Sequence, residues 1–385
     1  MRKDPASDDY TRAVEDALDI ACQAVEHAII LELASALKGI DPNMSQAEIA
    51  KRAAILASKV GKIAERGEAD VEKAVSAVMG ELAEANAEWG APYYEAAGAA
   101  MGAAATEAVE EGRKQAVKRV RELMKTSAME IVVKDGGRLR SKPIRDAYRA
   151  IVTAASKELA QGTGTPQKAV SKAVTSALGH MCESGVRIRY ESGTTRELYG
   201  AVRMNVMDTY RTAMQAGRDA MGKEFGADGV EVSAHGTCAP DHLPYQGRTY
   251  SNKEFAEIQD GLERPIAQGY NCRHTVHPVI MGELKPAHTD AELKRIEQFS
   301  TEKVTFKGLR GEEITMTRYE ATQYQRRMEQ QIRKANLEAA CADKAGGDSA
   351  THKARAKELR KAYREMSSSC GLATDLKRTR VHLPS

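Results

Sequence analysis

Histidine and cysteine side chains gather in one stretch of the chain, residues 235–282. Four of the nine histidines and two of the six cysteines lie there, together with several glycines and prolines. Imidazole nitrogen and thiolate sulfur are the ligands that zinc prefers, and four of them complete a closed tetrahedral site. The stretch is therefore a candidate zinc site. Its candidate ligands are His235, Cys238, His242, Cys272, His274 and His277.

The spacing of these ligands leaves two interpretations open. The pattern His-x2-Cys-x3-His is followed after about thirty residues by Cys-x-His, which is irregular compared with a zinc ribbon. On a strand, Cys272 and His274 would point to the same face. The alternative is a hydrogen-bonded core, because buried polar groups usually satisfy one another. In that interpretation His235 and His242 brace loops, and Arg273 pairs with Asp241 or with a backbone carbonyl.

Catalysis is the weaker interpretation of the same residues. Asp241 with His242, or Cys272 with His274, offers a general base or a nucleophile pair. However, the chain has no Gly-x-Ser-x-Gly, no His-Glu-x-x-His and no phosphate-cradling glycine loop. Neighbours in sequence seldom form a catalytic dyad, which distant segments usually assemble. We therefore assign no catalytic residue and expect a protein that is not an enzyme.

Helices must position this stretch. The 385 residues are 42% hydrophobic but only 5% aromatic, and alanine is abundant, which favours close-packed helices over sandwiches or barrels. Apolar residues recur at helical spacing along most of the chain. No apolar run is long enough for a transmembrane span, and no signal core follows the N-terminus, so we expect a protein made in a cytoplasm. The six cysteines form no dense framework, which predicts free thiols. Helices are predicted at about 11–38, 49–63, 69–89, 96–130, 143–160, 166–180, 195–225, 317–342 and 349–366.

Short strands are predicted where apolar and polar residues alternate. Such alternation occurs at 186–190 and 230–233, and a hairpin is predicted at 304–316 around Gly308 and Gly311. The fold class is thus mainly α with a small α+β domain. Four regions follow in order: a helical region 1–135, a helical segment 136–226, an α+β domain 227–316, and basic helices with a tail at 317–385.

Charge is segregated although the formal net charge is only +3. Residues 65–111 are strongly acidic, whereas 113–149 and 351–385 are basic. Such blocks steer binding to nucleic acid or to an oppositely charged partner, or they are simply solvated helix faces. Non-specific DNA binding needs only Lys and Arg near phosphates. The candidate DNA contacts are Lys353, Arg355, Lys357, Arg360, Lys361, Arg364, Lys377, Arg378 and Arg380.

Several short motifs in residues 233–282 resemble one known family. They are Ser233-Ala-His235, Pro240-Asp-His242, Tyr245-Gln-Gly-Arg-Thr-Tyr250 and Asn271-Cys-Arg-His274, followed by Pro278 and Gly282. Together they resemble the signature of the phage minor capsid protein 2 family, which is related to the Mu F-like head morphogenesis proteins. The resemblance covers roughly residues 145–340. Its signature residues here are Asp241, Tyr245, Gln246, Gly247, Asn271, Arg273, Pro278 and Gly282.

The chain departs from the family pattern at three places. Tyr245 replaces the usual tryptophan, Cys238 replaces a small residue, and Glu263-Arg-Pro265 replaces a Tyr-Gly segment. By analogy with the Cys-x2-Cys and Cys-Arg-Cys of Mu F-like proteins, the resemblance makes His242, Cys272 and His274 the better metal candidates. Cys238 or His235 would then be the fourth ligand.

The resemblance implies a head component at the portal vertex, inside a capsid assembled in the host cytoplasm. It implies a role in head assembly and in DNA packaging or ejection. The implied partners are the portal protein, major capsid or scaffold proteins and double-stranded DNA, with no membrane. The Ala/Gly-rich segment 96–105 adds a candidate for self-association. The alternative function is a metal-dependent nuclease delivered with the genome.

Overall fold

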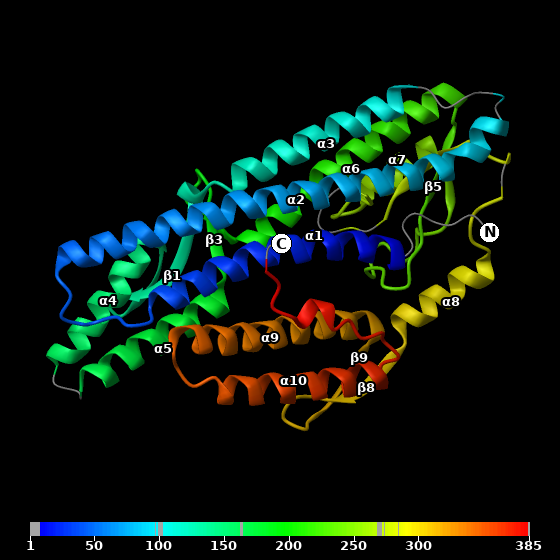
Figure 1. Ribbon diagram of the computed structural model, residues 1–385. Helices are drawn as coiled ribbons and strands as arrows, with labels where there is room; N and C mark the ends of the chain where they lie inside the picture. Colours follow the sequence, from blue (N-terminus) through cyan, green and yellow to red (C-terminus); the bar gives the residue numbers. More distant parts are fainter. Residues whose placement is uncertain are drawn as a thin grey trace.

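The computed structural model describes residues 8–96, 98, 103–161, 165–267, 272, 274–283 and 285–383. Most of them are helical, and short antiparallel strands form three small sheets, so the predicted fold class is confirmed (Figure 1). Within these ranges no helix combines the length and the apolar character that crossing a membrane requires.

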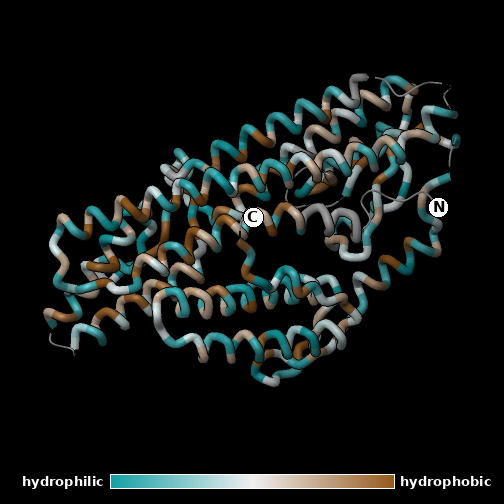
Figure 2. Tube along the Cα trace, viewed as in Figure 1, coloured by the Kyte–Doolittle hydropathy of each residue, from teal (hydrophilic) through white to brown (hydrophobic). Residues whose placement is uncertain are grey.

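Long helices lying side by side form the body of the molecule (Figure 1). They bury a continuous apolar core, and their brown positions in Figure 2 recur along each helix. The helices α3 and α6 approach closely because Gly112 lies opposite Ala213, where an added Cβ would overlap the alanine methyl group. These helices are α1 (Asp8–Ala36), α2 (Gln46–Ala96), α3 (Ala103–Leu123) and α6 (Leu198–Phe225).

Helix α2 corrects the prediction of two helices at 49–63 and 69–89. It runs unbroken for 51 residues, through Gly67 and through Pro92. Gly67 lies against Val25 of α1, where a Cβ would overlap the valine side chain, so packing offsets the low helix propensity of glycine. Beyond Pro92, Tyr93 and Tyr94 are buried against Phe225 of α6, which holds the last turns in helical conformation.

The predicted helix at 96–130 is also too long. Helix α3 ends at Leu123, and residues 129–143 form a hairpin of strands β1 and β2 in a sheet of order β2-β1-β3-β4. Its turn lies at Gly136 and Gly137, both with positive φ, a conformation that favours glycine. Met129, Ile131 and Val133 alternate as fully buried residues, which is the period of a strand and not of a helix. The strands are β1 (Met129–Asp135), β2 (Arg138–Pro143), β3 (Val186–Arg189) and β4 (Thr195–Glu197), with helices α4 (Ile144–Ala160) and α5 (Pro166–Ser184) beside them.

The C-terminal hairpins agree with the prediction. Strands β8 (Lys303–Lys307) and β9 (Glu313–Thr317) pair, and helices α9 (Arg318–Ala345) and α10 (Ala350–Ser369) follow. Thr317 and Glu320 form a capping box that begins α9. These elements share an apolar core of their own, but Leu337 and Cys341 at the end of α9 belong to the main core. The packing therefore joins the predicted C-terminal region to the first helices.

The residues after α10 pack against α1. His382 donates its backbone N–H to Nδ1 of His27 at 3.0 Å, and Arg378 forms an ion pair with Asp16. The side chain of Arg378 is only 13% exposed. This corrects the assignment of Arg378 as a DNA contact, because its guanidinium is already bound to protein carboxylates. Half of the Ala/Gly-rich segment at 96–105, namely residues 97 and 99–102, lies outside the described residues.

Candidate metal centre

A three-stranded sheet brings the two halves of the His/Cys stretch together. Strand β5 (Gly229–Val232) pairs with β6 (Thr249–Ser251) on one side and with β7 (Val276–Val279) on the other. Beyond these strands the pairing continues, since Ser233 donates its N–H to the carbonyl of Thr275 at 2.9 Å. His235 follows Ser233 and His274 precedes Thr275, so the two histidines lie beside this pair, with ring centroids 4.5 Å apart.

The loop between β5 and β6 is held by two signature residues. Gln246 accepts a hydrogen bond from the backbone N–H of His235 at 3.0 Å. Gly247 has φ +68°, and its N–H donates to the carbonyl of Val232 at 2.8 Å. A Cβ at Gly247 would overlap Leu293 of α8 (Asp290–Thr301), so both the turn and the close approach require glycine.

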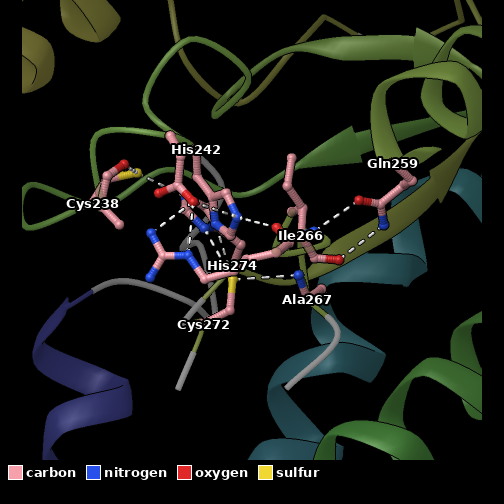
Figure 3. Close-up of polar contacts among 10 residues, drawn as sticks. Cys238, His242, Gln259, Ile266, Ala267, Cys272 and His274 are labelled. Carbon is pink, nitrogen blue, oxygen red and sulfur yellow. Dashed lines mark hydrogen bonds and ion pairs between the residues drawn. The ribbon is translucent and has the colours of Figure 1, made fainter. Parts of the chain in front are cut away.

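His242, Cys272 and His274 converge on one point, as Figure 3 shows. The sulfur of Cys272 lies 3.4 Å from Nδ1 of His242 and 3.4 Å from Nδ1 of His274. All three side chains are buried. The structure thus assembles the three residues that the resemblance ranked first as metal candidates.

The orientation of the His242 ring is fixed by the loop before Cys272. Its Nε2 lies 2.6 Å from the carbonyl of Arg264, which can only accept a hydrogen bond. Nε2 therefore carries a proton, and Nδ1 is the ring nitrogen that faces Cys272. A backbone carbonyl that binds the second ring nitrogen is the arrangement found behind metal-ligating histidines.

His235 and Cys238 belong to a second group that shares His274 with the first. Cys238 lies 3.5 Å from Nε2 of His274, the nitrogen opposite to the one that faces Cys272. The predicted fourth ligand therefore lies on the far side of the His274 ring. Among the described residues, the first group has three ligands.

The first group favours the ionised form of the Cys272 thiol. Burial alone would raise the pKa of this thiol, but hydrogen bonds with His242 and His274 lower it to about 5. For His242, burial acts to lower the pKa, yet the contacts with Cys272 and the Arg264 carbonyl outweigh it and raise the pKa. The protein thus stabilises a thiolate at neutral pH, which is the form that binds metals.

The geometry fits a tetrahedral ion. Zinc bonds of about 2.3 Å to sulfur and about 2.1 Å to nitrogen place the two ligand atoms about 3.6 Å apart. The two sulfur–nitrogen distances of 3.4 Å are close to this value. His242, Cys272 and His274 would hold the ion.

The remaining signature residues shape the surroundings. Asp241 pairs with Arg264 at 2.7 Å, where the sequence suggested Arg273. Asn271 and Arg273 lie outside the described residues. Pro278 packs against Gly222 of α6, where a Cβ would come within 2.7 Å of the proline ring.

Two other signature positions shape turns. Tyr245 accepts a hydrogen bond at its carbonyl from the Tyr250 hydroxyl at 3.1 Å. Gly282 has φ +84°, a conformation that favours glycine.

His277 belongs to neither ligand group. Its Nε2 lies 2.9 Å from the hydroxyl of Thr275, and its side chain is buried on β7. The acid–base pair of Asp241 and His242 is loose, at 3.8 Å, because the same carboxylate oxygen binds Arg264.

A polar cavity of about 270 Å³ opens beside the first group. His242, Cys272 and His274 line one side of it. Sequence reasoning did not place the residues on its other sides, which come from α6, α9 and the loop before Cys272. Helical spacing alone does not show which arginines face inward. These residues include Arg203, Arg264, Tyr319, Gln323 and Arg326.

Comparison with known proteins gives one match. A sequence model of the family described as Phage minor capsid protein 2 matches residues 23–368. Searches of curated proteins and of solved structures found no match.

Proposed function

The chain belongs to the phage minor capsid protein 2 family and is thus a virion component, and from this premise we propose that it acts at the portal vertex. There it contributes to head assembly and to DNA packaging or ejection. The match over residues 23–368 carries this proposal, because it includes the helical body, the His/Cys cluster and both C-terminal helices. The long helices suit such a role. At 1.5 Å per residue, the 51 residues of α2 extend over about 75 Å and offer a long flank to partners.

Mass spectrometry of purified heads tests the location. We expect the chain in heads, and we expect it to copurify with the portal protein when both are expressed together. Heads that contain portal but not this chain would refute the proposal. The major capsid protein, expressed in place of portal, is the matched comparison.

The exposed face of α10 supports non-specific DNA binding. Among the basic residues of this helix, Lys353, Arg355, Lys357, Lys361 and Arg364 are exposed. Lys353 and Lys361 pair with Asp343 and Glu365, at 3.0 and 3.9 Å. Lysine and arginine on one solvent-facing side can contact phosphates without reading bases.

Salt dependence of DNA affinity tests this surface. Each phosphate contact contributes about −0.9 to the slope of log affinity against log salt. Replacing Arg355, Lys357 and Arg364 with glutamine should make the slope less steep by about 3. The matched control replaces Lys59 and Lys172, which are exposed but pair with acids elsewhere. An equal change of slope in both variants would contradict the assignment.

We also propose that His242, Cys272 and His274 bind a transition metal, for which zinc is the best candidate. The support is the convergence of three buried zinc-type ligands and the fixed orientation of His242. The ion would tie the loop between β5 and β6, which carries His242, to the segment before β7 that carries Cys272 and His274. Elemental analysis of protein purified without a His tag should find one zinc per chain. Absence of stoichiometric metal would leave the hydrogen-bonded core.

A metal-dependent nuclease is the second candidate function. One observation favours it: the ligand group borders a cavity, and catalytic zinc sites combine three protein ligands with an open position. Metal-dependent cleavage of DNA that disappears in His274→Ala would support this function. Unchanged DNA after incubation with the metal-loaded protein would exclude it.

A further inference from the structure

The cavity beside the His/Cys cluster is built from segments far apart in the sequence. Arg203 comes from α6, Arg264 from the loop before Cys272, and Arg326 from α9. His242, Cys272 and His274 form another side of the cavity. The cavity therefore exists only in the folded chain.

The lining of this cavity has more cationic than anionic groups. It contains three arginines, and none of the described residues that line it carries a carboxylate. Thr237, Tyr319 and Gln323 add neutral hydrogen-bonding groups. A second cavity of about 250 Å³ shares Arg203, Gln323 and Arg326 with the first. Its lining also contains the carboxylates of Asp19 and Glu329, so the surface there is mixed in charge.

Two of the arginines are held in place from behind. The guanidinium of Arg264 binds Asp241 with distances of 2.7 and 3.0 Å. Arg203 lies 3.3 Å from Asp19 of α1, and its side chain is 20% exposed. Groups that are already oriented lose little conformational entropy when a ligand binds.

The cavity also reaches solvent. The side chain of Arg264 is 47% exposed, and Gln323 is exposed on α9. A small anion can thus enter without any helix moving. A volume of about 270 Å³ exceeds many times the roughly 10–15 Å³ that one water needs.

We propose that this cavity binds a phosphate group. Arginine presents a planar fork of N–H donors that matches the oxygens of phosphate, and such charge-assisted bonds are among the strong ones. Three arginines around one polar cavity suit a multiply charged oxyanion better than a carboxylate. The phosphate can come from inorganic phosphate or a mononucleotide, or from the backbone of a DNA strand.

Isothermal titration of the full-length protein with inorganic phosphate tests the proposal. We expect saturable binding with a stoichiometry of one. Arg326→Gln removes one cation and should weaken binding about ten- to a hundredfold. The matched control is Arg140→Gln, which removes an exposed arginine of β2 and should leave phosphate affinity unchanged.

Competition distinguishes the two sources of phosphate. If a short single-stranded oligonucleotide displaces inorganic phosphate at lower concentrations than a mononucleotide does, then DNA is the source. If the mononucleotide competes better, the natural ligand is a small phosphate compound. In both cases the Arg326→Gln variant should bind the competing compound more weakly than the unmodified protein does.

The proposal fails if phosphate does not bind at millimolar concentrations, or if Arg326→Gln and Arg140→Gln bind it equally. Should Arg326→Gln not fold, Arg326→Lys keeps the charge without the fork and should still bind, but more weakly. None of these results depends on the location of the chain in the phage head. Failure here would therefore leave the proposed portal role untouched.

Discussion

Arg378 offers the sharpest test of how the C-terminal segment is held. Its guanidinium forms an ion pair with Asp16 of α1 and lies 3.8 Å from Glu329 and 3.6 Å from Asp375. The side chains of Arg378, Asp16 and Glu329 are 13%, 18% and 8% exposed. The arginine is thus the cation at the centre of three carboxylates where α1, α9 and the C-terminal segment meet.

The substitution Arg378→Met keeps the side-chain length but removes the charge. Breaking a buried ion pair by removing one partner costs about 3–5 kcal/mol, because a charge remains buried without compensation. Since these side chains keep some exposure, we expect a loss near the lower end, about 3 kcal/mol, in the free energy of unfolding. Arg380→Met is the matched control. Arg380 is exposed two residues further on, and its loss should change stability by no more than about 0.5 kcal/mol.

Urea unfolding followed by circular dichroism measures both variants. A double-mutant cycle with Asp16→Asn isolates the pair. In the Asp16→Asn background, Arg378→Met should lower the free energy of unfolding much less, because the Asp16 carboxylate that pairs with Arg378 is absent. Hydrogen exchange of residues 375–383 should rise in Arg378→Met and stay unchanged in Arg380→Met.

The pH dependence supplies an independent check. Burial raises the pKa of Asp16 even though Arg378 opposes this shift. Without Arg378 the pKa rises further, so the penalty of Arg378→Met grows as pH increases through the folded-state pKa and shrinks in acid. A cost below about 0.5 kcal/mol at neutral pH, or a cost that is larger in acid, would refute this account.

Three further predictions concern other parts of the molecule. His27 accepts a hydrogen bond from the His382 N–H, and burial lowers the pKa of His27 to about 3, so stability should fall by roughly 1.4 kcal/mol per pH unit below about 6.5. His27→Asn retains an acceptor and should abolish that part of the slope in urea unfolding. Gly112→Leu should cost about 1–3 kcal/mol, measured in the same way, because its side chain would overlap Ala213. Cys272→Ser should reduce zinc content in elemental analysis to background, because serine replaces the thiolate ligand.

Each of these has its own control. Arg380→Met changes an exposed residue and no histidine, so this variant should keep the fall of stability below pH 6.5. Loss of that pH dependence in Arg380→Met as well would show that His27 is not its source. Gly61→Leu is the match for Gly112→Leu, since Gly61 lies within α2 and has open space around its Cα. Equal losses in both glycine variants would indicate a helix effect and not a packing effect. Cys370→Ser, at a buried thiol outside both ligand groups, should leave the zinc content unchanged.

Local sequence signals predicted much of the fold. Thr165 caps α5 ahead of Pro166, Thr317 and Glu320 begin α9, and the β8–β9 hairpin lies where alternation and glycine placed it. Each of these features depends on residues a few positions apart, so the printed order of residues contains the whole signal. The exceptions were α2 and β1. At α2, packing against Val25 and Phe225 overrides glycine and proline, and the contacts that do so come from distant helices.

The candidate site divides in the same way. Residue types and the family resemblance were enough to select His242, Cys272 and His274, because ligand chemistry belongs to the side chain itself. Only the tertiary structure decided that His274 presents opposite ring nitrogens to Cys272 and Cys238, which separates one apparent cluster into two groups. It also decided that Arg203, Arg264 and Arg326 face one cavity, while Arg378 is buried against Asp16. A sequence states which charges a chain contains, but the direction each one points depends on how its helix packs.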